Sequence, residues 1–169
     1  EQDQIKDIIL EAYQKHLLRH GKNPISIFAF CETLEISEDE FYNHFRSFKN
    51  IEKAIWESFV LNTIEILEND PEFEMYNARE KTLAFFYTFI EILKQNRSFV
   101  LFRLENLNIV NKAVPFFLAD LFKSYTNFMS GIIQEGIENQ EIQARPLITD
   151  HYVQGYKLLI GSILKIWTT

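Results

Sequence analysis

The sequence is poor in the residues that cross-link, break or bend a chain. Among 169 residues there are one cysteine, five glycines and four prolines. A single cysteine cannot form an internal disulfide, which is typical of proteins in a reducing compartment, and we therefore expect a cytoplasmic location. We interpret Cys31 as a small buried apolar residue rather than a redox group. Because glycine and proline are the residues that interrupt helices, their scarcity favours long helices with few turns.

Membrane segments and catalytic motifs are also missing from the sequence. No run of about 18 apolar residues occurs, so we expect no membrane span, and the residues from Glu1 onward show no signal-peptide pattern. The sequence has no glycine-rich phosphate loop, no Gly-x-Ser-x-Gly and no cysteine with a placed histidine, which argues against an enzyme and against a cofactor. His16 and His20 have the spacing of two ligands on one helix face, but no third ligand completes a known zinc pattern, so we expect no metal site.

The charge balance is acidic. The chain has 24 Asp or Glu against 17 Lys or Arg, a net charge of −7. Residues 1–60 alone carry seven basic and eleven acidic side chains, a net charge of −4. Because Lys and Arg neutralise phosphates and supply most non-specific affinity for DNA, this balance argues against strong non-specific binding to nucleic acid.

Apolar residues, which include 16 Phe, recur at steps of three and four residues along most of the chain. This period is that of an amphipathic helix, and no segment shows the alternation of a strand. We therefore predict an all-α fold. The predicted helices cover residues 3–20, 25–34, 37–45, 48 or 50 to 69, 77–95, 98–110, 115–139 and 146–167.

Two of these helices are short and separated by a tight turn at residues 35–36. Ser37 and Glu40 form a capping box, in which each side chain bonds to the backbone N–H of the other residue. Phe41, Tyr42 and Phe45 give the second short helix a buried face. Two short helices joined in this way are the outline of a helix-turn-helix. The apolar set of the first short helix is Ile27, Phe28, Phe30, Cys31 and Leu34.

This stretch resembles the helix-turn-helix signature of the tetracycline-repressor (TetR/AcrR) family. The matching residues are Ile36, Ser37, Phe41, Tyr42, His44, Phe45, Ser47 and Ile51. Weaker matches in the two preceding helices are Ile8, Ile9, Ala12, Gly21, Ser26, Ile27, Phe30 and Cys31. The resemblance covers about residues 5–60. It implies a TetR-like architecture with an N-terminal helix-turn-helix head over residues 1–48 and a C-terminal helical effector and dimerisation domain over residues 49–169.

The sequence departs from the family pattern at the turn and at the DNA-facing positions. Glu35 replaces the family's turn glycine, and because a left-handed non-glycine residue costs roughly 1 kcal/mol we expect a different turn geometry. Phe48 replaces a lysine that meets a DNA phosphate, and Lys49 is the candidate substitute. Residues 38–40 are all acidic, where the family tends to have small or basic residues.

The resemblance implies DNA contacts in the head. Tyr42 and His44 would touch the DNA backbone, while the start of the second short helix would read base edges in the major groove. Carboxylates there can accept a hydrogen bond from cytosine N4; alternatively, they only cap the helix and the head is a scaffold. The candidate DNA-binding residues are Ser26, Ser37, Asp39, Glu40, Tyr42, Asn43, His44 and Lys49.

The middle helices are rich in aromatic residues. They could form a packed core, or they could line a ligand cavity, since ligand pockets are mostly apolar with a few polar groups. The family's ligand-sensing role favours a pocket for a small apolar molecule. The candidate ligand-binding residues are Phe86, Phe89, Phe102, Asn106, Phe117, Tyr125 and Phe128.

The last predicted helix carries few charges, and a helix this apolar is buried on several sides. In the resembled family the last two helices form a four-helix bundle across a two-fold axis, so we predict a homodimer. The leading hypothesis is a transcription regulator that binds a palindromic operator in double-stranded DNA and responds to a small apolar ligand. The alternative is a TetR-shaped ligand-binding or protein-interaction module that has lost DNA binding.

Overall fold

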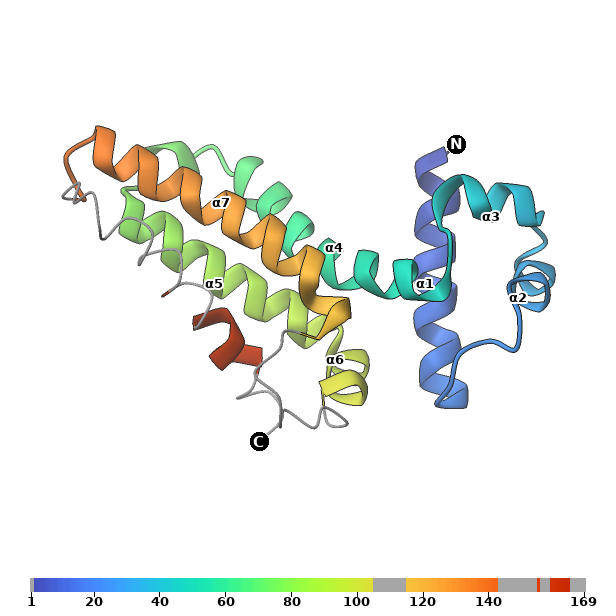
Figure 1. Cartoon of the computed structure of the whole chain (residues 1–169). Helices are drawn as coiled ribbons and strands as arrows, with labels where there is room; N and C mark the ends of the chain where they lie inside the picture. Colours follow the sequence, from blue (N-terminus) through green and yellow to red (C-terminus); the bar gives the residue numbers. More distant parts are fainter. Residues whose placement is uncertain (1, 105–114, 143–154, 156–158, 165–169) are drawn as a thin grey trace.

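A computed structural model describes residues 2–104, 115–142, 155 and 159–164 (Figure 1). Every element assigned within these ranges is a helix, which confirms the predicted all-α fold. None of the helices described is long and apolar enough to cross a membrane. The elements are α1 (Gln2–His20), α2 (Ile27–Leu34), α3 (Glu38–His44), α4 (Phe48–Glu68), the 3-10 helix η1 (Phe73–Met75), α5 (Ala78–Gln95), α6 (Arg97–Leu104), the 3-10 helix η2 (Phe116–Leu118) and α7 (Ala119–Glu138).

Helices α1, α2 and α3 form a head at one end of the molecule, and α4 leads from it into the body (Figure 1). The core of the head is aromatic. Tyr13 of α1 stacks on Phe48 at the start of α4, with ring centroids 5.5 Å apart. Phe30 of α2 meets Phe41 of α3 edge to face at 6.4 Å. Phe41 and Phe45, the C-cap of α3, are buried as predicted, but Tyr42 is 50% exposed, so its expected place on the buried face is wrong. Tyr42 follows Phe41 directly and so points to another side of the helix.

The turn between α2 and α3 keeps the left-handed geometry that a glycine would favour. Glu35 has φ 56° and ψ 35°, so the expectation of a different turn geometry is wrong. Ile36 donates its N–H to the carbonyl of Cys31 at 3.2 Å, and Glu35 donates to the carbonyl of Glu32 at 3.3 Å. These bonds pair carbonyls that the end of α2 would otherwise leave free, and they offset the strain at Glu35.

The capping box at the start of α3 is confirmed. Glu40 donates its N–H to Ser37 Oγ at 3.1 Å, and Ser37 donates its N–H to Glu40 Oε2 at 2.8 Å. Ser26 similarly accepts the N–H of Ala29 at 3.1 Å, and as N-cap it sets the start of α2 at Ile27 rather than at residue 25.

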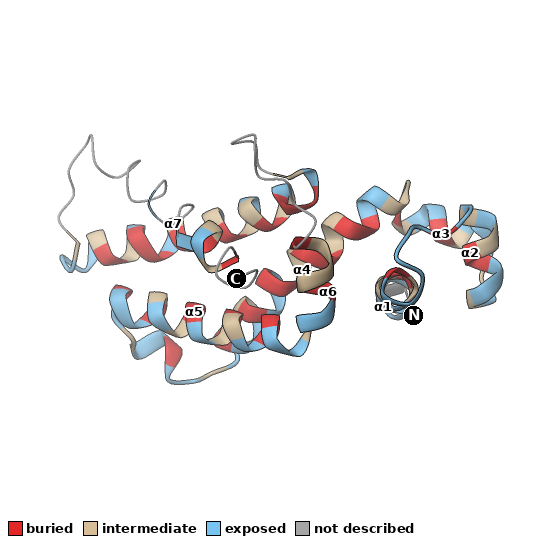
Figure 2. Ribbon diagram, turned by 90° about the horizontal axis from the view of Figure 1, so that it is seen from below, coloured by how far each residue is buried: buried red, intermediate tan, exposed pale blue. Residues whose placement is uncertain are grey.

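The body is built from α4, α5 and α7, which run side by side, with α6 at the end nearer the head (Figure 1). Figure 2 shows that the buried residues of these helices face one another. Phe85 and Phe89 of α5 and Tyr125 of α7 are fully buried at this contact. The core of the body is therefore aromatic as well.

Several boundaries differ from those predicted. The single helix predicted over 115–139 is in fact two elements: the 3-10 helix η2, and then α7, which begins at Ala119. The 3-10 helix η1 was not predicted. Helix α6 is described as far as Leu104, and the remainder of the predicted 98–110 helix, with most of the 146–167 helix, lies outside the described residues.

Candidate functional site

Most of the candidate DNA-binding side chains lie on the surface of the head. Tyr42 is 50% exposed, and its ring stands edge-on against buried Phe41 at 5.5 Å. The core therefore supports Tyr42 while its outer part faces solvent. The exposed candidates are Ser26, Ser37, Asp39, Tyr42, Asn43 and Lys49, while Glu40 and His44 are partly covered.

The three acidic residues of α3 have different surroundings. Glu40 accepts hydrogen bonds from both the N–H and the hydroxyl of Ser37, each at 2.8 Å. The bond from the Ser37 backbone, followed by that from its hydroxyl, lowers the pKa of Glu40. That carboxylate is committed to the cap and is poorly placed to read a base. Glu38 and Asp39 remain exposed.

Lys49, the candidate phosphate contact, lies close to the body. Its Nζ is 5.7 Å from the centroid of the Phe116 ring in η2, a cation–π distance. Because Lys49 is also exposed, its flexible side chain can leave this ring at little cost. The structure thus places Lys49 where the head, α4 and the body meet.

A shallow hollow of about 240 Å³ separates α2 from α3 on the head. Phe28, a member of the apolar set of α2, lines it and is 57% exposed, so it does not share the buried face of Phe30 and Cys31. The reason is geometric: α2 has only eight residues, and Phe30 and Cys31 already fill its buried face. The acids around the hollow are Glu32, Glu38 and Asp39.

A buried ion pair joins α4 to α6. Arg103 donates to Glu52 Oε1 through its Nε and through a terminal nitrogen. Glu52 is 4% exposed, and burial raises the pKa of its carboxyl although the neighbouring guanidinium acts in the opposite direction. Arg103 Cζ also lies 5.1 Å from the centroid of the Phe117 ring.

Further polar contacts fix α4 and the head against the body. Lys53 Nζ lies 3.7 Å from Asp120 Oδ2 of α7, and Ser124 of α7 donates its hydroxyl to Glu57 Oε1 at 2.6 Å. On the other side of the head, Gln14 of α1 donates to Asn96 Oδ1 at 3.2 Å. A displacement inside the body can therefore reach the head through two routes, α4 and α1.

The candidate ligand-binding residues fall into separate places. Phe85, which is absent from that set, is the centre of one group: the centroids of its four ring neighbours lie 5.4–5.8 Å away. Phe117 instead contacts Trp56 at 5.5 Å. Phe102 is partly buried, and Asn106 lies outside the described residues. The ring neighbours of Phe85 are Phe86, Phe89, Tyr125 and Phe128.

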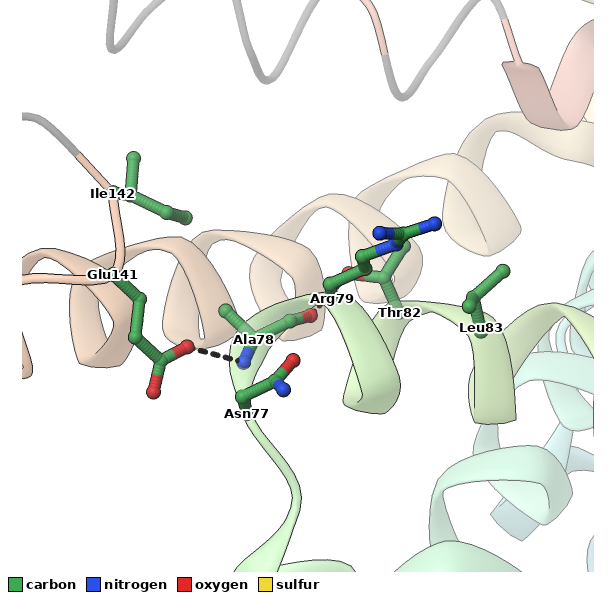
Figure 3. A pocket seen from close by; sticks show the side chains of 7 residues that line it. All are labelled: Asn77, Ala78, Arg79, Thr82, Leu83, Glu141 and Ile142. Carbon is green, nitrogen blue, oxygen red and sulfur yellow. Dashed lines mark hydrogen bonds between the residues drawn. The ribbon is translucent and has the colours of Figure 1, made fainter.

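An open cavity of about 460 Å³ lies at the start of α5 (Figure 3). Glu141, beyond α7, accepts the N–H of Ala78 at 2.7 Å, so a carboxylate of the chain already caps this helix end. No candidate ligand-binding residue lines the cavity. Its lining residues are Asn77, Ala78, Arg79, Thr82, Leu83, Glu141 and Ile142.

Trp56 of α4 is a residue that sequence reasoning did not assign to the site. It is fully buried, and its Nε1 has no hydrogen-bond partner in the part of the chain that is described. In the sequence Trp56 is one more apolar residue on an amphipathic helix, and no local pattern reveals whether its N–H finds an acceptor.

Comparison with known proteins identifies the family. Residues 81–169, more than half of the chain, match the model of the tetracyclin repressor-like C-terminal domain. The chain belongs to the TetR family. Members of this family are transcription regulators rather than enzymes, and the TetR-like fold predicted from the head is confirmed by the body. No curated protein and no solved structure matched the chain.

Proposed function

We propose that this TetR-family chain is a DNA-binding regulator that responds to a small apolar ligand. The head, residues 1–48, binds double-stranded DNA, and the body, residues 49–169, binds the ligand and forms a homodimer. The observation that carries the proposal is the helix-turn-helix itself. The left-handed turn at Glu35 and the capping box at Ser37 hold α3 with an exposed polar face, as entry into a major groove requires.

Regulation follows from the way α4 joins the two parts. This helix has 21 residues and so spans about 30 Å. Its first turns pack against Tyr13 of the head, while Trp56 and Phe59 lie in the body. A ligand that prefers one arrangement of α4 shifts the population between two spacings of the paired heads, only one of which fits an operator.

A salt-dependent binding assay tests the DNA proposal. The full chain is mixed with a random duplex library at about 50 mM salt, and bound sequences are selected and measured again as salt rises. Binding should fall steeply with salt. Tyr42→Ala should weaken it roughly tenfold, as expected for loss of about 1.4 kcal/mol. Tyr87→Ala is the matched control, because Tyr87 is 71% exposed on α5 of the body and should bind as the wild type does.

A second candidate function is supported by the charge of the head. Glu38 and Asp39 are exposed at the start of α3, where phosphates of a duplex would approach. In this second view the chain is a TetR-shaped ligand-binding or protein-interaction module without DNA affinity. Replacing both residues with Lys should raise non-specific affinity if α3 meets DNA. Unchanged affinity in that variant, together with no selected sequence for the wild type, would favour the module.

Dimerisation and ligand binding have their own measurements. Sedimentation equilibrium should give twice the chain mass at micromolar concentration. Solvent extraction of the purified protein, followed by mass spectrometry, should release an apolar small molecule. If the protein is a monomer, the proposal that two heads bind one operator is wrong. Ligand binding in the body is tested separately, by the extraction experiment.

A further inference from the structure

The indole of Trp56 lies where three elements of the body meet. It is 0% exposed. Its ring is 5.5 Å from Phe59 on the same helix, 5.8 Å from Phe99 of α6 and 5.5 Å from Phe117 of η2, measured between centroids. Three aromatic rings, from α4, α6 and η2, therefore pack around the indole.

The polar atom of this indole is unpaired. Tryptophan Nε1–H is a donor only, and here it meets no acceptor among the described residues. Buried polar groups are nearly always paired, because an unpaired group loses its hydrogen bond to water on burial and gains none within the protein. The carboxylate of Glu52, one turn earlier on α4, pairs through Oε1 with Arg103. The donor is thus left available for a molecule from outside.

The charges around the indole restrict what that molecule can be. Glu52 and Arg103 neutralise each other, so the site supplies no net charge to a guest. A charged guest would lose its hydration without gaining a counter-ion, which is costly in an aromatic interior. We propose that the ligand of the body is an uncharged, largely apolar molecule whose oxygen or nitrogen acceptor binds Trp56 Nε1–H between Phe99 and Phe117.

Phe117 lies between the indole and a partly exposed arginine. Arg103 Cζ lies 5.1 Å from the Phe117 ring, and the Arg103 side chain is 27% exposed. Arg103 and Phe117 therefore link the surface to the buried indole. Phe117 belongs to η2, a 3-10 helix of three residues, and the hydrogen bonds of a 3-10 helix have poorer geometry than those of an α-helix. The ligand pushes Phe117 outward and binds against Trp56, between Phe99 and the displaced Phe117 ring.

This assignment rests on the proposed ligand-sensing role of the body and adds two things to it: the chemical class of the ligand and the residue that selects it. Trp56 selects for an acceptor because an apolar molecule of the same shape leaves the N–H unpaired. A site that offers a buried hydrogen-bonding group discriminates against molecules that cannot use it.

The test uses two probes that differ chiefly by one oxygen, acetophenone and ethylbenzene. Each is titrated into the full chain labelled with ¹⁵N, and the indole N–H signals are followed by NMR. Trp56 and Trp167 are the two tryptophans of the chain, so Trp167→Phe identifies the signal of Trp56. Acetophenone should move the Trp56 signal downfield, as a new hydrogen bond does, and should bind about tenfold more tightly than ethylbenzene, equivalent to 1.4 kcal/mol.

A variant separates this inference from the proposed function. Trp56→Phe keeps an aromatic ring and removes the donor, so it should abolish the preference for acetophenone, while Tyr87→Phe on the surface of α5 should keep it.

Equal binding of both probes by the wild type would overturn the acceptor assignment and leave ligand sensing intact. Binding of neither probe would overturn the proposed ligand class, and the extraction experiment would still decide whether the body carries a ligand. An unmoved Trp56 signal during acetophenone binding would place the ligand elsewhere, without depending on whether the variant folds.

Discussion

Arg103, in the last turn of α6, places its guanidinium against the carboxylate of Glu52 near the start of α4, although the two residues are 51 positions apart. The pair lies between the head and the body, beside the aromatic cluster of Trp56 and Phe117. It neutralises a carboxylate that is almost fully buried and thereby determines how α6 and α4 are held together.

Removing the cation of this pair should destabilise the protein. Arg103→Met leaves the buried carboxylate of Glu52 without a partner. Breaking a fully buried pair costs about 3–5 kcal/mol, and since Arg103 is 27% exposed we expect about 2 kcal/mol by urea unfolding. Lys94→Met is the control, because the Lys94–Glu91 pair has both side chains more than half exposed and should change stability by less than about 0.5 kcal/mol. Equal losses in the two variants would contradict a special role for the Glu52 pair.

The buried carboxyl should also give stability a measurable pH dependence. Burial raises the pKa of Glu52 in the folded protein, so the folded state holds this proton more tightly than the unfolded state does. The stabilising effect of protonation is complete below the unfolded pKa and is lost as pH rises through the raised folded pKa. Glu52→Gln removes this titration. The free energy of unfolding of the wild type, minus that of the variant, should fall as the pH rises above about 4, the ordinary range of a glutamate; a difference that rises with pH would show that the guanidinium outweighs burial.

The left-handed residue in the helix-turn-helix should accept glycine. Glu35 has φ 56°, a conformation in which its Cβ is strained. Glu35→Gly relieves this strain, but it also gives the unfolded chain more freedom, so we expect a net gain of about 0.5 kcal/mol in thermal or urea unfolding. Glu32→Gly, three residues earlier in the helical part of α2, should instead lose about 1 kcal/mol. A loss at both positions would indicate that the Glu35 side chain contributes more than its backbone strain costs.

Two glycines of α7 should respond to alanine with opposite signs. A Cβ on Gly136 would lie 2.8 Å from Ala78 Cβ and 2.8 Å from Ile142 Cδ1, too close for unmoved neighbours. Gly136→Ala should therefore cost about 1–2 kcal/mol through overpacking. A Cβ on Gly131 meets nothing within 4 Å, and Gly131→Ala should stabilise the helix by about 0.5–1 kcal/mol. Urea unfolding of both variants checks the pair, and the same sign at both positions would contradict the close contact of α5 with the end of α7.

The head was largely predictable because its signals are local. The capping box joins Ser37 to Glu40, three residues apart, and the apolar spacing of Phe41 and Phe45 defines one face of α3. The exposed positions of Asp39 and Asn43 on α3 follow from the same spacing. The exposure of Phe28 did not follow, since an eight-residue helix has room for few inward side chains and neighbouring elements decide which of them turn inward.

The body was predictable as helices but not as a site. Phe86, Phe89 and Tyr125 were recognisable as aromatic residues of the middle helices, yet only packing placed them around Phe85. The match of residues 81–169 assigns this part to the family without specifying which of its rings form a core and which face a ligand.

The sequence by itself determined the helical class, the helix-turn-helix and its caps, because helix periodicity and capping are relations between residues three or four positions apart. The left-handed turn at Glu35 became visible only in the backbone itself. Only the tertiary structure decided that Glu52 meets Arg103 and that the Trp56 N–H meets no acceptor among the described residues. Those outcomes depend on contacts between elements distant in the chain, where burial sets the cost of every unpaired charge and donor.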